Sequence, residues 1–310
     1  LSDNRSVFLE NTGDGFVKRK LGLGIGYESV RGASAADYTG NGCLDVFVVQ
    51  ANDWVETRPT GYNNRNVTIM EDNGNPNRLF RGNCEGFEET TSEAGIEGTA
   101  WSLATSFVDF TNDGYPDIHV ANDFNNDVLY VNNGNGSFER RTLPGSTNRN
   151  SMSSEVADIN GDGFLDIFVS NIYHLDGGVT GVSSGYYDGR ARGNNLLINS
   201  GNGTFEDQAE EYGVKRGGWG WSALLEDFDN NRHLDLYQTT ELVGMFWKNN
   251  GTYRRVNSSV SGIGGISTKG AVAFDHDRNG KLDIAEAVDP FAPNREIGWI
   301  RFNENNLFTG

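Results

Sequence analysis

One nine-residue pattern occurs five times in this chain, and no other feature constrains the fold as strongly. The pattern reads D-x-[DNT]-x-[DN]-[GR]-x-x-D, and its copies begin at Asp37, Asp109, Asp158, Asp227 and Asp275. Oxygen-bearing side chains occupy positions 1, 3, 5 and 9, and the glycine that is usual at position 6 permits a sharp turn. Because calcium takes about six to eight oxygen ligands, the pattern predicts a calcium loop in each copy, with up to five ions in all.

The predicted metal ligands are the side chains at positions 1, 3, 5 and 9 of each loop. They are Asp37, Thr39, Asn41, Asp45, Asp109, Thr111, Asp113, Asp117, Asp158, Asn160, Asp162, Asp166, Asp227, Asp229, Asn231, Asp235, Asp275, Asp277, Asn279 and Asp283. Thr39 replaces an acidic residue in the first loop, and Arg232 replaces glycine in the fourth, so these two sites are expected to be weak or empty. An Asx-rich turn without metal is the alternative, since Asp, Asn and Gly dominate turns. The fivefold repetition of one carboxylate spacing favours calcium.

The loops differ from EF-hands, which need a glutamate at position 12 and a helix on each side. Short apolar runs such as Val46–Val49 and Ile167–Val169 follow the loops, and runs such as Ala104–Val108 precede them. Each loop is therefore expected to link two strands. Two further strands, one on each side of a Gly/Asn turn, complete each unit, as in Val128–Val131 and the run that starts at Phe138.

Repeated four-stranded units predict an all-β fold, a β-propeller with five blades favoured and a calcium loop in each blade. The N-terminal segment Ser6–Val17 matches the hairpin half of a unit, and the chain ends soon after the fifth loop. We therefore expect a single domain over residues 1–310, closed into a ring by pairing between N- and C-terminal strands.

Two alternate units carry long insertions at the same point, Gln50–Asn77 and Ser170–Asn194. A four-stranded unit places these inserts at the edge opposite the metal loops, and long loops on one face of a rigid scaffold commonly carry binding. Aromatic residues expected near this edge form the predicted ligand-binding set: Trp54, Trp101, Tyr173, Tyr187, Trp219 and Trp221. For the tryptophans, packing between blades is the alternative.

Cys43 lies in the first metal loop, and Cys84, the other cysteine, lies in a hairpin turn on the same edge of the same predicted unit. A disulfide between them is expected, with two unrelated thiols as the alternative. Together with calcium, it indicates an extracellular or cell-surface protein. Asn66 and Asn257 lie in N-x-[ST] sequons and are candidate glycosylation sites.

The formal net charge of −18 argues against a partner made of DNA or RNA, because phosphate recognition needs a basic surface. No apolar run reaches the length of a membrane-spanning helix. The chain begins at Leu1, which we interpret as the start of a trimmed chain or of a fragment.

The chain resembles the FG-GAP/VCBS repeat family, whose calcium-loop propeller repeats also occur in integrin α-subunit heads. More narrowly, it resembles the cartilage acidic protein (ASPIC/UnbV-type) group. The matching stretches are Ser151–Asn171, Gly218–Asp229 and Ala121–Tyr130. The resemblance implies a secreted or surface propeller with calcium in each loop and a role in adhesion or recognition.

The sequence shows no nucleophile–base motif, so no catalytic residue is predicted. We expect a calcium-binding recognition or adhesion protein whose protein or glycan ligand docks on the insert-bearing face. A larger extracellular assembly is a further candidate partner. A lectin, and a polysaccharide lyase or dehydratase built on a propeller, are the alternatives.

Overall fold

Every regular element in the computed structural model is a β-strand, and no helix occurs among the described residues. The structure describes residues 7–20, 23–25, 30–51, 74–144, 150–173, 192–241, 244–256, 267–288 and 300–303. The chain divides into two compact units, Leu1–Leu143 and Pro144–Gly310.

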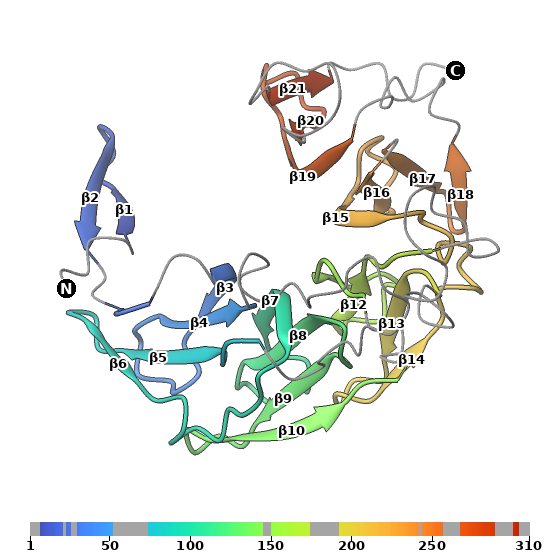
Figure 1. The fold of residues 1–310 in the computed structure, drawn as a ribbon. Coiled ribbons are helices and arrows are strands. Elements are labelled where there is room, and N and C mark those ends of the chain that lie inside the picture. Colours follow the sequence, from blue (N-terminus) through green and yellow to red (C-terminus); the bar gives the residue numbers. More distant parts are fainter. Residues whose placement is uncertain are drawn as a thin grey trace, which may run out of the picture. The chain divides into compact units, whose positions relative to one another are not determined.

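The first unit contains a hairpin and two four-stranded antiparallel sheets (Figure 1). The hairpin pairs β1 (Val7–Asn11) with β2 (Phe16–Lys20). One sheet has the order β3-β4-β5-β6, with the bounds Val30–Ala36, Asp45–Gln50, Arg78–Gly82 and Phe87–Glu89. The other runs from β7 to β10, with the bounds Trp101–Val108, Asp117–Asp123, Val128–Asn132 and Phe138–Thr142.

The second unit contains two four-stranded sheets and one three-stranded sheet, again antiparallel and in chain order. The strands β11 to β14 span Glu155–Ala157, Asp166–Val169, Asn195–Asn199 and Phe205–Asp207. The strands β15 to β18 span Gly220–Glu226, Asp235–Thr240, Met245–Asn249 and Tyr253–Val256. The third sheet contains β19 (Thr268–Phe274), β20 (Asp283–Val288) and β21 (Ile300–Asn303).

The hydrophobic core lies between the facing sides of successive sheets. In the first unit, Phe47 and Leu79 of one sheet pack in one cluster with Ile118 and Tyr130 of the next. In the second unit, Phe168 and Leu196 pack in the same way with Leu236 and Trp247. The first strands of successive sheets also contact each other within each unit, as β3 does β7 and β15 does β19. This face-to-face stacking of four-stranded sheets is consistent with the predicted β-propeller.

The chain order of each sheet separates two edges. The predicted metal loops link the first strand to the second, as β7 to β8 and β15 to β16, and this part of the prediction is confirmed. The turn between the third and fourth strands lies at that same edge, because consecutive strands are antiparallel. The connection between the second and third strands lies at the opposite edge. Both long inserts occur there, between β4 and β5 and between β12 and β13.

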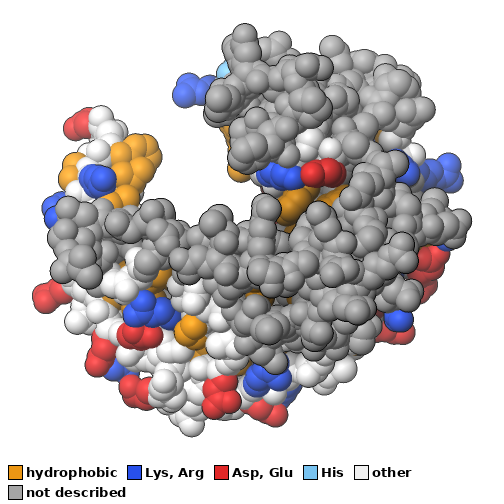
Figure 2. All heavy atoms as spheres, viewed as in Figure 1, with side chains coloured by type: hydrophobic (Ala, Val, Ile, Leu, Met, Phe, Trp, Pro, Cys, Tyr) orange, Lys and Arg blue, Asp and Glu red, His pale blue; other side chains and the backbone are white. Residues whose placement is uncertain are grey.

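The N-terminal hairpin keeps apolar side chains exposed, and Figure 2 shows hydrophobic side chains gathered on it. Leu9 is 56% exposed and Phe16 is 69% exposed. β1 and β2 form a sheet of their own among the described residues. The predicted ring closure, the count of five blades and the single domain over residues 1–310 therefore stay predictions.

Candidate metal loops and an aromatic edge

All five loops share one backbone frame, which is built by their own side chains. The position 1 aspartate accepts the N–H groups of positions 5 and 6, as Asp37 does from Asn41 (3.1 Å) and Gly42 (2.7 Å). The position 5 side chain accepts the N–H of position 7, as Asn41 does from Cys43 (2.8 Å). Corresponding bonds recur in the other four loops. The loop conformation is therefore held by Asx side chains before any metal is considered.

The aspartate at position 9 ties the loop to the sheet. Asp117 Oδ2 accepts the N–H groups of Phe110 (2.9 Å) and Thr111 (3.0 Å), and its Oδ1 accepts that of Asn132 at the end of the third strand (2.8 Å). The equivalent third-strand bond, at 2.7–2.8 Å, joins Asp45, Asp166 and Asp235 to Gly82, Asn199 and Asn249. Each of these aspartates is fully buried.

Burial raises the pKa of these aspartates because it disfavours the charged carboxylate. The pKa of Asp117 rises to about 6 and that of Asp235 to about 7, although backbone N–H groups that donate to each carboxylate oppose the rise. The pKa of Asp45 and of Asp166 is raised by the same cause. A cation bound beside such a carboxylate would favour its ionised form, so this chemistry fits a metal ligand.

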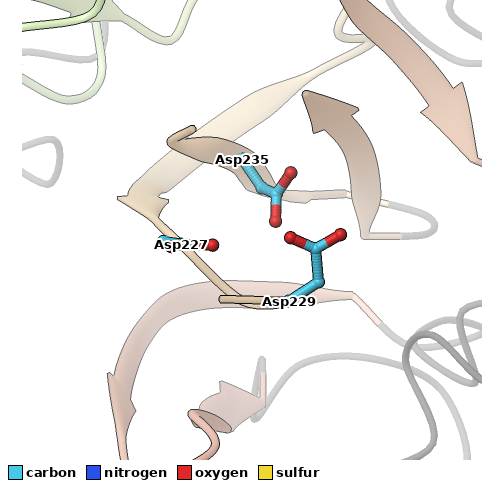
Figure 3. Close-up of side chains that lie close together, drawn as sticks. All are labelled: Asp227, Asp229 and Asp235. Atoms are coloured by element: carbon cyan, nitrogen blue, oxygen red, sulfur yellow. The ribbon is translucent and has the colours of Figure 1, made fainter. Parts of the chain in front are cut away.

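Three carboxylates converge in the fourth and fifth loops. In the fourth loop, one oxygen from each of Asp227, Asp229 and Asp235 lies within 4.8 Å of the others. Figure 3 shows these three side chains close together. The fifth loop brings Asp275, Asp277 and Asp283 together in the same way. The carboxylates that converge are those at positions 1, 3 and 9, and position 5 is an asparagine in both loops, where it accepts the N–H of position 7.

Two buried oxygen atoms in these clusters have open acceptor capacity. Asp229 Oδ1 and Asp283 Oδ1 have no hydrogen-bond partner among the described residues. A buried carboxylate oxygen without a donor is costly unless a cation or another donor meets it. The donor set of carboxylates at positions 1, 3 and 9 therefore fits a hard divalent cation.

The first two loops have threonine at position 3. The hydroxyl groups of Thr39 and Thr111 lie 3.4 Å from the Oδ1 atoms of Asp37 and Asp109, to which they donate. Among the described residues, the first three loops hold no cluster of three carboxylates like those of the fourth and fifth. The first site is still predicted to be weaker. At position 3, Thr39 offers a neutral oxygen, whereas Asp229 and Asp277 offer charged oxygens.

Arg232 does not distort the fourth loop. It adopts a left-handed φ of 73°, and its N–H still donates to Asp227 Oδ2 (2.8 Å), as glycine does at this position in the other loops. Placing a residue with a Cβ there costs about 1–2 kcal/mol. Position 4 is also left-handed in every loop, with φ between 58° and 76° at Gly40, Asn112, Gly161, Asn230 and Arg278. Sequence reasoning missed this requirement, although Gly or Asn at position 4 in four copies was its signal.

The structure joins Cys43 and Cys84 by a disulfide, with their Cα atoms 5.2 Å apart. Cys43 is position 7 of the first loop, and Cys84 lies in the turn between β5 and β6. The bond therefore ties the first metal loop covalently to the third and fourth strands of its own sheet.

A cluster of aromatic and charged side chains lies at the insert edge of the second unit. The rings of Trp219 and Trp221 stack with centroids 6.3 Å apart and an interplanar angle of 20°. Trp221 Nε1 donates to Glu241 Oε2 (2.8 Å), and the Lys269 ammonium lies 3.8 Å from the centroid of the Trp221 ring. Lys269 also forms an ion pair with Glu241. Both indoles are half-buried, so part of each is open to solvent.

Tyr173 belongs to the same edge. Its N–H donates to the carbonyl of Gly218 (2.7 Å), and Ile172 forms a β-bridge with Trp219. The Arg216 guanidinium lies 5.7 Å from the centroid of the Tyr173 ring. The structure thus brings three of the predicted ligand-binding residues to one edge of one unit.

The other predicted positions differ. Trp101 is only 5% exposed and lies edge-on to Phe124, which follows β8 of the same sheet, with ring centroids 5.5 Å apart. Trp54 and Tyr187, together with the candidate glycosylation sites Asn66 and Asn257, lie outside the described residues.

Three of the connections between a second and a third strand are closed at their base by the same kind of hydrogen bond. The N–H of Gln50 donates to Asn77 Oδ1 (3.0 Å), and the N–H of Asn171 donates to Asn194 Oδ1 (3.0 Å). Asp127 plays the same part in the short connection between β8 and β9, where it accepts the N–H of Asn122 (2.8 Å). We call this bond the base clamp. Sequence reasoning missed it, because an isolated Asn or Asp before a strand has no distinctive pattern.

A small polar cavity lies beside one clamp in the first unit. Its lining includes Asn77, Ser102, Asn122 and Asn126, and its volume is 40 Å³. That space suits water, whereas ligand pockets usually have about 300–1,000 Å³. The open aromatic edge is therefore the better candidate for recognition.

Fold and loops together define an all-β, propeller-like protein with repeated Asx-rich loops. Residues 109–169 match the FG-GAP-like repeat family model, which supports the FG-GAP repeat assignment for that stretch. No curated protein sequence matches the chain significantly.

Many solved structures are similar to the chain, among them a lectin and a biofilm matrix protein. An Agrocybe aegerita lectin, described as recognising non-reducing terminal N-acetylglucosamine, is 16% identical, with a TM-score of 0.51 over 96% of this chain and 73% of its own. A biofilm matrix protein of V. cholerae is also 16% identical, with a TM-score of 0.47 over 89% of this chain and 38% of its own. At these identities the likeness concerns the fold alone. Among the described residues, no helix is long and apolar enough to cross a membrane.

Proposed function

We propose that this chain is an extracellular recognition module, stabilised by calcium at the loop edge and binding its ligand at the insert edge. The observation that carries recognition is the half-buried Trp219–Trp221 pair, flanked by Glu241 and Lys269 and set beside Tyr173. Aromatic faces with a few placed polar groups are typical of binding sites. The disulfide is compatible with an extracellular setting.

A glycan is the first ligand class to test. The half-buried indoles provide aromatic surface, and Glu241 and Lys269 place an acceptor and a donor beside it. The fold likeness to a lectin that recognises terminal N-acetylglucosamine supports including that sugar among the probes. A protein ligand, and assembly into a larger extracellular structure, form the second class.

We expect Trp221→Ala to reduce ligand binding at least about tenfold, because the substitution removes one of two stacked indoles and the partner of Glu241. The measurement is binding to a glycan array that includes terminal N-acetylglucosamine, and to a panel of extracellular proteins. Tyr115→Ala is the matched control, since Tyr115 is an exposed aromatic residue (40%) at the opposite edge of its sheet. Equal binding by both variants and the parent would place recognition elsewhere.

The proposed calcium sites use the side chains at positions 1, 3 and 9. The fourth and fifth loops each bring three carboxylates together at these positions. When bound, the ion would neutralise the converging carboxylates. Hydrogen bonds to the side chains at positions 1, 5 and 9 hold the loop that carries these carboxylates.

Calcium is therefore expected to raise the midpoint of thermal unfolding relative to chelator. Each site would contribute about 2.7 kcal/mol at a hundredfold excess over its dissociation constant, because the ion binds the folded state selectively. Differential scanning calorimetry in calcium, in magnesium and in chelator measures the shift. Asp277→Asn should reduce the calcium-dependent part. Identical midpoints in calcium and chelator would exclude the proposal.

A further inference from the structure

A lysine from the third strand of the sheet forms an ion pair with an aspartate of the fourth loop. The Lys248 ammonium lies 2.7 Å from Asp229 Oδ2, and the two side chains are only 31% and 11% exposed. Lys248 belongs to β17 and directly precedes Asn249, whose N–H donates to Asp235 (2.7 Å). The third strand of the sheet therefore brings the ammonium to the carboxylate cluster.

The same strand position differs in the first three loops. The residue that precedes the third-strand partner of the position 9 aspartate is Arg81, Val131 or Ile198. Arg81 forms an ion pair with Glu88 (2.8 Å), and its own loop has Thr39 where the fourth has Asp229. The fourth loop thus combines a position 3 carboxylate with a lysine that reaches it.

We propose that Lys248 is an internal counter-cation of the fourth loop, which competes with calcium for Asp229. The inference rests on the proposed calcium binding and concerns which of two similar sites binds more tightly. The fourth and fifth loops each bring three carboxylates together. The ammonium offsets one negative charge of the fourth cluster and already binds one of its three carboxylates. Calcium must displace this ammonium or bind beside it, against repulsion between like charges.

Two consequences separate the fourth loop from the fifth. Without metal, Lys248 keeps the charge of Asp229 paired, so the fourth loop depends less on calcium for its stability. With metal, the fourth loop binds more weakly than the fifth. Arg232 preserves the backbone bond to Asp227, and the residue is exposed, whereas Lys248 pairs directly with Asp229.

The test is Lys248→Met in the whole chain, measured by calcium titration calorimetry and by thermal unfolding in chelator. We expect one class of calcium site to tighten about tenfold or more, because a unit charge is removed from the cluster. In chelator the same variant should melt at a lower temperature than the parent, because Asp229 loses its partner. Arg255→Met is the matched control, since it removes the same charge from the neighbouring strand β18, where Arg255 pairs with Trp247 and is exposed.

Lys248→Gln serves if the methionine variant does not fold. In an Asp229→Asn background, either Lys248 substitution should tighten calcium binding less than it does in the parent, because the ammonium no longer occupies a carboxylate ligand and only its charge repulsion is removed. If the parent binds calcium and the Lys248 variants bind it with the same or lower affinity, the counter-cation role is wrong while calcium binding stands. If neither parent nor variants bind calcium, both proposals are wrong. Calcium binding that appears only in the Lys248 variants supports the proposal that Lys248 competes with calcium for Asp229.

Discussion

Replacing Asp117 with alanine is expected to lower the free energy of unfolding by about 3–5 kcal/mol, because it leaves buried N–H groups without acceptors. The carboxylate accepts from Phe110, Thr111 and Asn132 and is fully buried. Its loss removes the link between the loop, the second strand and the third strand. Denaturant unfolding, followed in both calcium and chelator, measures the change.

The two conditions separate two roles of Asp117. A destabilisation that persists in chelator reflects the hydrogen-bond frame, whereas one confined to calcium reflects metal binding alone. Asp14→Ala is the control, because Asp14 lies exposed in the hairpin turn. Asp117→Asn should cost less than alanine, since its amide oxygen still accepts one set of bonds. If Asp117→Ala and Asp14→Ala unfold alike, the frame described for the loops does not stabilise the sheet.

Replacing Cys43 and Cys84 together with serine is expected to lower stability by about 3–4 kcal/mol, because the bond closes a long loop in the unfolded chain. The two cysteines are 41 residues apart. The parent treated with a reductant should then unfold at the same denaturant concentration as the double variant.

Peptide mapping without reduction should find the linked pair. Two freely alkylated cysteines in the native protein, or identical unfolding of oxidised parent and double variant, would contradict this prediction. The reduced parent is the matched control for the oxidised parent, because it keeps both cysteine side chains and loses only the disulfide bond.

The strands and loops were predictable because each depends on a pattern of residues that are close together in the sequence. The apolar run Val46–Val49 and the Asx pattern that starts at Asp37 each lie within a few residues, and both form the expected structure. Short-range hydrogen bonds such as that from Cys43 to Asn41 need no distant partner. The four-stranded unit followed because its turns recur in the same order in successive repeats.

The less predictable features depend on contacts between segments that are distant in the sequence. Lys248 reaches Asp229 only because β17 pairs with β16, and nothing in the local sequence distinguishes it from an exposed strand lysine. Trp101 and Trp219 occupy equivalent repeat positions, yet Trp101 is buried against Phe124, whereas Trp219 is half-buried. For Trp101, the ring that covers it comes from the connection after β8, which the repeat position does not specify.

The base clamp allows the inserts to vary in length independently of the sheets. Asn77 and Asn194 fix the two ends of a long segment with the same bond that Asp127 uses in a short one. The two strands of the sheet are therefore joined by the same hydrogen bond whatever the length of the segment beyond it. Each doubling of the length of a closed loop costs only about 0.6 kcal/mol of conformational entropy. A segment at this edge can thus change in length or sequence at little cost to the sheet that carries it.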